Sequence, residues 1–163
     1  MDVFDAIKGR RSVRKYKLDS VPNEVIEKIL DAARWAPSAG NIQPWKFIVI
    51  SDRNLLELVR KVSPGYLGEA PLAILVCSGR ERAYRVGGTL GRDYLSVSDC
   101  SMAVENMLLA ATDDGLGSCV YTFLNKKEEN ELKKILHATQ ENRIACLIQL
   151  GYTKIKPVSP HRK

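Results

Sequence analysis

The sequence predicts a fold in which α-helices cover a β-sheet, and three observations support this. Residues 22–36 place apolar side chains at helical spacing, with charged side chains on the opposite face. The strands expected at residues 46–51 and 72–77 contain the continuous apolar runs FIVI and LAILVC, which is typical of strands buried on both faces. Residues 96–114 are rich in Ala, Met, Leu and Val on every side, as expected for a central buried helix. The length of 163 residues suits one domain, and we expect a single domain over residues 1–163.

The elements of the first half follow from local signals. Residues 3–8 fit a short helix that Gly9 can end in the left-handed conformation. Pro22 suits the first turn of the next helix, and Pro37 prevents its continuation because the residue before a proline is pushed out of the α region. Beyond the first strand, helical spacing returns over residues 53–62.

In the second half of the chain, a predicted loop comes first. Residues 79–93 contain four glycines and no clear period, which predicts a mobile loop. Gly115 closes the central helix, within which Glu105 and Asn106 need polar partners or an interface. Asn125 and Glu128 form a capping pair that opens a charged helix reaching residue 136. The remaining strands are expected at residues 118–123 and 143–151.

Composition excludes several classes of protein. No apolar run approaches the roughly 20 residues that span a bilayer, and the N-terminus lacks the apolar core of a signal peptide, so we expect a cytoplasmic protein with no membrane partner. The four cysteines are widely spaced without a C-x-x-C pair, and the chain has only two histidines. We therefore expect no metal site and no disulfide, and interpret the cysteines as small buried hydrophobes.

The positive charge is concentrated at the two ends. The chain has a net charge of +6, yet residues 1–17 and 154–163 each carry +4 and the middle nets −2. Two compact basic termini suit a small phosphorylated ligand better than a groove-tracking nucleic-acid surface. We expect no nucleic-acid partner, and a small basic nucleic-acid-binding or regulatory domain remains the alternative.

The N-terminal basic cluster is the motif GRRSVRKY, residues 9–16. In an extended segment Arg10, Ser12 and Arg14 would share one face while Arg11 and Val13 point the other way. Such a face can hold an anion. The alternative is a solvated basic surface, which is the commoner role of Arg-rich stretches.

Several motifs together resemble the nitroreductase family of FMN-dependent oxidoreductases. The arginine motif RRSVR is followed, some 23 residues on, by the loop APSAGNIQPW at residues 36–45. Further matches are Ala70-Pro71 before an apolar strand, Asp99 near the start of the central helix, the run GLGSC at residues 115–119, and Gly151-Tyr152 before a basic tail. They occur in family order from residue 7 to residue 163.

The resemblance implies an α+β fold with a mixed, mainly antiparallel sheet flanked by helices, and a homodimer that holds FMN at its interface. It implies ping-pong transfer of hydride from NADH or NADPH, through FMN N5, to a small-molecule acceptor such as a nitroaromatic or quinone. FMN carries this chemistry, so no catalytic side chain is expected. Because no G-x-G-x-x-G follows a strand, the nicotinamide would share the flavin pocket. A flavin carrier without turnover is a further alternative.

The resemblance also assigns residues to FMN. Arg10, Arg11 and Ser12 would hold its phosphate and ribityl end, and Arg14 would face N1 and O2 and tune the charge of the flavin. The loop residues that would reach FMN from the partner subunit are Pro37, Ser38, Ala39, Asn41 and Gln43. The backbone along the flavin near N5 would come from Val120, Tyr121 and Thr122. The phosphate would be closed in by Arg162 and Lys163.

Each of these last three groups has a structural alternative. The loop at residues 37–45 has the composition of an ordinary turn, Tyr121 fits a core aromatic, and Arg162 with Lys163 fits a frayed terminus. Many family members carry other residues where this chain has Tyr121-Thr122-Phe123. We therefore expect a substrate pocket of a different shape.

Overall fold

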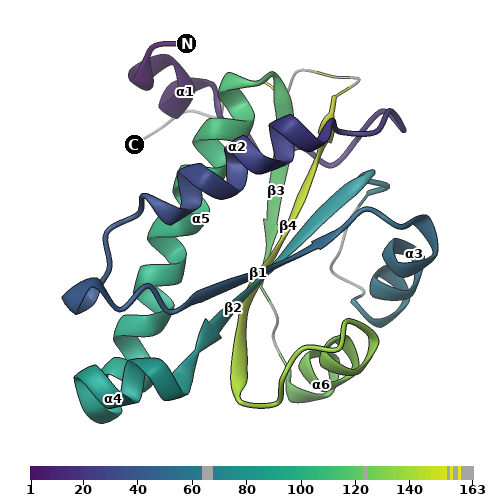
Figure 1. The fold of residues 1–163 in the computed structure, drawn as a ribbon. Coiled ribbons are helices and arrows are strands. Elements are labelled where there is room, and N and C mark those ends of the chain that lie inside the picture. Colours follow the sequence, from purple (N-terminus) through teal and green to yellow (C-terminus); the bar gives the residue numbers. More distant parts are fainter. Residues whose placement is uncertain (64–67, 123–124, 154, 156–157, 159–163) are drawn as a thin grey trace.

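A four-stranded antiparallel sheet forms the centre of the molecule (Figure 1). The computed structural model describes residues 1–63, 68–122, 125–153, 155 and 158. The strand order is β1-β2-β4-β3, and every neighbouring pair is antiparallel. The strands are β1 (Trp45–Ile50), β2 (Leu72–Gly79), β3 (Leu116–Tyr121) and β4 (Asn142–Tyr152). The predicted α+β class is confirmed, and a parallel contact occurs as an isolated bridge between Ser12 and Ser118.

Helices cover both faces of the sheet and create two apolar cores. On one face, α2 (Asn23–Arg34) and α5 (Ser96–Asp113) pack against alternate residues of β2 and β4. On the other face lie α3 (Arg53–Val62) and α6 (Lys126–Ile135) (Figure 1). All eight residues of β2 are buried, as its apolar run predicts.

The expectation that residues 46–51 are buried on both faces is wrong. β1 lies at the edge of the sheet and pairs with β2 alone. Lys46 and Val49 are exposed, and Ile50 is the one fully buried residue of the strand. An apolar run identifies a strand but does not distinguish a central strand from an edge strand.

The helix ends follow the capping signals with one exception. Asn125 accepts a hydrogen bond from the Glu128 N–H at 2.8 Å, as predicted, and Gly115 has the left-handed φ of 76° that ends α5. Gly9 does not take the predicted left-handed conformation. It is the last residue of α1 (Val3–Gly9), and Arg10 leaves the helix in an extended conformation.

The predicted loop at residues 79–93 is helical instead. α4 (Arg80–Leu90) is followed by a π-helical turn, Gly91–Leu95, that leads into α5. Gly88, at φ 57° and ψ −146°, breaks the helix, so no single apolar period runs through the segment. Asp93 stabilises it by pairing with Arg80 at 3.1 Å and Arg92 at 2.8 Å.

All four cysteines are buried free thiols, which confirms their structural interpretation. Burial raises the pKa of Cys77 to about 11 and those of Cys100 and Cys146 to about 12. These three thiols therefore stay protonated at neutral pH. Within residues 1–63, 68–122 and 125–153, no helix has the length and apolar character needed to cross a membrane.

Candidate functional site

The arginine motif is held against the edge strand β3 by its backbone. The Val13 N–H donates to the Ser118 carbonyl at 2.8 Å, beside the parallel bridge between Ser12 and Ser118. The Tyr16 hydroxyl donates to the Val13 carbonyl, and the Lys17 N–H donates to the Tyr152 carbonyl at 2.7 Å. These bonds fix the backbone of the segment at both ends. They do not use its basic side chains, which can contact other groups.

The side chains of the motif alternate as predicted between residues 12 and 14. Val13 is buried, whereas Ser12 and Arg14 are exposed. Arg14 lies close enough to Cys119 for its positive charge to lower the pKa of that thiol, although burial is the larger effect and raises it overall. Arg14 is thus placed over β3, on the solvent side.

Arg10 is directed to a different element. Its Nε lies 3.4 Å from Oε1 of Glu105, on α5, and is buried without a hydrogen bond. Arg11 is half-buried and donates from Nη1 to the Arg10 carbonyl at 2.6 Å. Arg10 and Arg14 therefore occupy separate ends of the motif, one at the central helix and one at the sheet.

The end of β3 and the residue after it, Thr122, follow the part of the strand that contacts the motif. Val120 and Thr122 are exposed, and Val120 is 36% accessible. Tyr121 is half-buried, packs against the core beside α3 and α6, and donates its hydroxyl to Oε1 of Glu128 at 2.8 Å. The side chain of Tyr121 thus has a structural role. The backbone and the exposed neighbours of this segment lie beside the arginine motif.

The loop between α2 and β1 has an unusual backbone. Gly40, Asn41 and Gln43 all have left-handed φ values, of 56°, 55° and 49°. The Gln43 N–H donates to Ser38 Oγ at 3.0 Å, and Gln43 Nε2 donates to Asn41 Oδ1 at 2.9 Å. Left-handed residues other than glycine are uncommon and cluster at functional sites. Pro37, Asn41 and Gln43 are exposed, so this loop presents polar side chains to the outside.

Asp99, on α5, attaches this loop to the core. Its Oδ1 accepts a hydrogen bond from the Ala39 N–H at 3.2 Å. Asp99 is only 2% exposed, and its Oδ2 is buried without a hydrogen-bond partner. Burial raises the pKa of this carboxyl. Asp99 matches the family pattern in the sequence, and nothing in the sequence alone indicates its hydrogen bond to the loop.

The central helix connects the two parts of the candidate site. Glu105 and Asn106 have the polar partners that the sequence requires: Glu105 pairs with Arg10, and Asn106 Nδ2 donates to the Ala32 carbonyl at 3.0 Å. Asp99 lies six residues before Glu105, about 9 Å along the helix. The arginine motif and the loop are therefore each attached to α5, at different heights. The predicted residues Arg162 and Lys163 lie outside the described residues.

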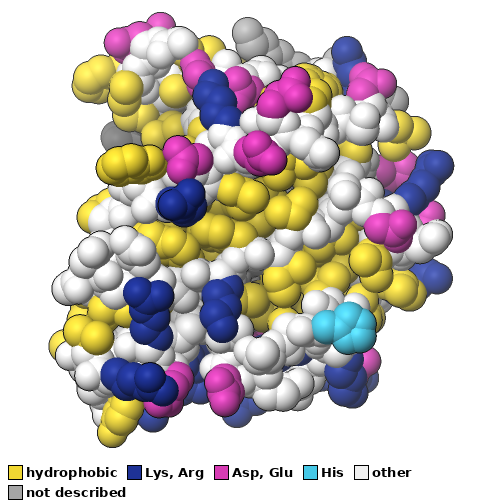
Figure 2. All heavy atoms as spheres, viewed as in Figure 1, with side chains coloured by type: hydrophobic (Ala, Val, Ile, Leu, Met, Phe, Trp, Pro, Cys, Tyr) yellow, Lys and Arg dark blue, Asp and Glu magenta, His cyan; other side chains and the backbone are white. Residues whose placement is uncertain are grey.

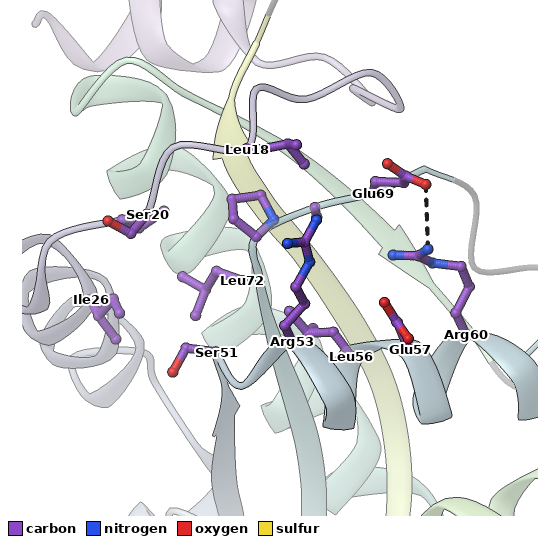
Figure 3. A pocket seen from close by; sticks show the side chains of 13 residues that line it. Leu18, Ser20, Ile26, Ser51, Arg53, Leu56, Glu57, Arg60, Glu69 and Leu72 are labelled. Atoms are coloured by element: carbon purple, nitrogen blue, oxygen red, sulfur yellow. Dashed lines mark ion pairs between the residues drawn. The ribbon is translucent and has the colours of Figure 1, made fainter.

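The candidate residues that the structure describes are exposed or half-buried, and Gln43 lines a hollow of about 430 Å³ together with residues of β1 and α4. A second cavity, of about 280 Å³, is lined by Leu18, Ser20 and Val21, by α3 and by residues 69–72 (Figure 3). Arg53 points into it, and Arg60 contacts Glu69 at 3.6 Å. None of the predicted site residues lines this cavity.

Large apolar side chains are exposed near the candidate loop and on two helices. Trp35, which opens the loop, is 80% exposed, and Phe4 of α1 is 67% exposed. Leu90 of α4 and Tyr94 of the π-helical turn are 59% and 69% exposed. Figure 2 shows apolar side chains at the surface of α1 and α4. Contiguous exposed apolar side chains are typical of interaction surfaces.

Comparison with known proteins identifies the family. The profile of the nitroreductase family matches residues 7–64 and 58–152, and the chain belongs to this family. It is 42% identical, over 161 residues, to a protein of Methanothermobacter thermautotrophicus that is provisionally named NADH dehydrogenase/NAD(P)H nitroreductase; the alignment covers 96% of this chain and 80% of the relative. An iodotyrosine deiodinase of Thermotoga neapolitana is 27% identical over 177 residues, which cover 92% of this chain and 88% of that protein.

Solved structures share the fold. A protein of Parabacteroides distasonis, provisionally named as the same kind of reductase, superposes with a TM-score of 0.86 at 29% identity, covering 99% of this chain and 92% of that one. An FMN-dependent nitroreductase of Clostridium difficile gives a TM-score of 0.83 at 27% identity, covering 97% and 91%. The predicted nitroreductase-like fold is thereby confirmed.

Proposed function

We propose that the protein is an FMN-dependent oxidoreductase that uses NADH or NADPH to reduce a small oxidised acceptor, such as a nitroaromatic or a quinone. The observation that carries the proposal is the fixed segment at residues 10–14, which places exposed Ser12 and Arg14 beside the exposed end of β3 in a nitroreductase fold. The named relatives support the same class of enzyme.

The chemistry of the residues fits FMN. Its phosphate needs cationic and N–H donors, and Arg10 has a buried Nε without a hydrogen bond. Ser118, which pairs with Ser12, has a buried hydroxyl without a partner. Arg14 forms no ion pair within the described residues, so its guanidinium is available for a ligand. These donors would be satisfied by a phosphorylated, polar cofactor.

In this proposal each group has one task. Arg10, Arg11 and Ser12 bind the phosphate and ribityl end, with Arg162 and Lys163 added from the tail. Arg14 holds positive charge at the pyrimidine edge, and residues 120–122 lie along the ring. When bound, FMN supplies the hydride transfer between NAD(P)H and the acceptor. The protein orients the flavin and tunes its charge, and solvent supplies protons.

We further propose a homodimer in which the loop at residues 37–43 reaches the FMN of the partner subunit. Within one chain, the loop hydrogen bonds to itself, to α5 and to the end of β2, where Gly79 N–H donates to the Pro44 carbonyl at 2.7 Å. Its exposed polar residues, beside the exposed Trp35, suit a surface completed by a second copy.

The test begins with the colour of the purified protein. We expect flavin absorbance bands, uptake of FMN by the apoprotein, bleaching by NADH or NADPH without oxygen, and recovery of the bands on addition of a nitroaromatic or quinone. A colourless protein that takes up no FMN and binds duplex DNA in a salt-sensitive way would support the nucleic-acid alternative. FMN that stays oxidised with NAD(P)H would indicate a carrier.

A further inference from the structure

The carboxylate of Asp99 is buried in a way that fold stability does not explain. It is 2% exposed and receives one hydrogen bond, from the Ala39 N–H, while its second oxygen has no partner. Among the described residues no cation forms an ion pair with it. A buried carboxylate with so little compensation lowers the stability of a fold, and an apolar residue of similar size would pack there more favourably. Its presence therefore indicates a role other than stabilising the fold.

The partner of Asp99 is the first residue of a strained turn. Ala39 begins the short 3₁₀ turn Ala39–Asn41, in which Gly40 and Asn41 are left-handed, and Gln43 follows with φ 49°. A left-handed conformation is unfavourable for residues other than glycine and persists only where the surrounding structure holds it. The Asp99 bond, at 3.2 Å, attaches the start of this turn to the rigid central helix.

The remaining attachments lie on either side of the turn. Ser38 Oγ accepts from the Gln43 N–H at 3.0 Å, which closes the loop on itself. The Pro44 carbonyl accepts from Gly79, which fixes the start of β1 to the end of β2. Val86 of α4 lies over Gly40, since a Cβ on that glycine would be 3.5 Å from its methyl group. Among the residues that the structure describes, Asp99 therefore supplies the hydrogen bond that joins the turn to α5.

We propose that Asp99 is a positioning residue for flavin binding. Its Oδ1 fixes the Ala39 amide and so sets the direction in which Asn41 and Gln43 present their side chains to the FMN of the partner subunit. This inference rests on the proposed function. Asp99 acts through the backbone and touches neither the cofactor nor the substrate.

Two substitutions at Asp99 separate the hydrogen bond from the charge. Asp99→Asn keeps an oxygen that can accept from Ala39, so its dissociation constant for FMN should stay within a few-fold of the wild-type value. Asp99→Ala removes the acceptor and should raise that constant about tenfold or more, since the hydrogen bond that holds the Ala39 amide is lost. The visible circular dichroism of bound FMN should change with it.

The matched control is Asn106→Ala on the same helix. It removes the bond from Asn106 Nδ2 to the Ala32 carbonyl, which joins α5 to α2 and does not touch the turn. We expect a lower melting temperature with unchanged FMN affinity and dichroism. Hydrogen exchange of the Ala39 amide in the apoprotein gives a readout without cofactor, and it should be faster in Asp99→Ala but near wild type in Asp99→Asn.

The outcomes are distinct. An Asp99→Ala protein that binds FMN as tightly as wild type overturns the role, even if its melting temperature falls. An Asp99→Asn protein as weak as Asp99→Ala shows that the charge acts and the hydrogen bond does not, which also overturns it. A wild-type protein that binds no FMN overturns the proposed function and this role together, while the exchange of the Ala39 amide still reports on the bond itself.

Discussion

Arg10 and Glu105 form an ion pair between the N-terminal motif and the central helix, with Arg10 Nε 3.4 Å from Glu105 Oε1. The pair is partly open to solvent, because the Glu105 side chain is 51% exposed and that of Arg10 is 24% exposed. The ion pair orients the Arg10 side chain but leaves its Nε–H donor without a hydrogen bond. A phosphate arriving here would meet an oriented guanidinium and a nearby negative charge.

The first prediction concerns this pair and the cofactor phosphate. Arg10→Met should weaken FMN binding about tenfold or more and leave riboflavin binding unchanged, because one charge-assisted bond is worth roughly 1.5 to 3 kcal/mol. Glu105→Gln should leave FMN affinity equal or slightly higher, because a like charge near the phosphate is removed. Fluorescence titration with both flavins measures this. If Arg10→Met weakened riboflavin as much as FMN, Arg10 would not be a phosphate ligand.

The second prediction concerns Arg14 and the redox potential. Reduction adds negative charge near N1 and O2, and a guanidinium about 4 Å away at an effective dielectric of about 20 attracts it by roughly 4 kcal/mol. For a two-electron couple that corresponds to on the order of 90 mV. Arg14 is exposed, so solvent should reduce the effect. We expect Arg14→Met to lower the midpoint potential of bound FMN by tens of millivolts, with a modest loss of affinity.

The control for this measurement is Arg10→Met, which should shift affinity more than potential. Potentiometry of both variants with FMN bound makes the comparison. An unchanged potential in Arg14→Met together with a shifted one in Arg10→Met would reverse the assignment of the two arginines.

The third prediction tests how tightly the motif packs on β3. A Cβ at Gly117 would lie 2.8 Å from atoms of Val13, so Gly117→Ala must push the motif away from the strand. We expect a loss of about 1 to 3 kcal/mol in the free energy of unfolding, together with weaker FMN binding. Gly9→Ala is the control, since its Cβ would meet Thr112 at 3.7 Å, an ordinary contact. It should be neutral or stabilising by about 0.5 to 1 kcal/mol. Urea denaturation that ranks the two alike would contradict this packing.

The sequence predicts the elements whose signals are local. The period of residues 22–36 corresponds to α2, and Asn125 caps α6 as its spacing from Glu128 indicates. The sequence does not predict α4, because a broken helix held by ion pairs of Asp93 has no continuous apolar period. The edge position of β1 could not be predicted either, because strand order depends on contacts distant in sequence.

In the candidate site, too, the sequence predicts the features that have local signals but not the contacts between distant residues. The arginine motif and the loop at residues 37–45 were found from their residue types and order, through the resemblance to the family. Their attachment to α5, by Glu105 and Asp99, joins residues 95 and 60 positions apart, and no local pattern reveals such pairs. The structural role of the Tyr121 hydroxyl likewise appears only when α6 is seen to place Glu128 beside it.

In the proposed homodimer one FMN is held by the arginine motif of one subunit and the loop of the other. A mixed dimer tests it, with Arg10→Met in one chain and Asn41→Gly in the other; glycine keeps the left-handed φ of 55° while removing the amide. Each homodimer of a single variant should bind FMN weakly at both sites. In the mixed dimer, a shared site combines both substitutions in one pocket and leaves the second pocket wild type.

The measurement is FMN titration of the mixed dimer, purified through a different tag on each chain. We expect about one FMN per dimer bound with wild-type affinity, and a second site weaker than in either variant homodimer. Two weakened sites, one with the affinity of each variant homodimer, would place the motif and the loop of the same chain at one flavin, and would rule out a site shared between subunits.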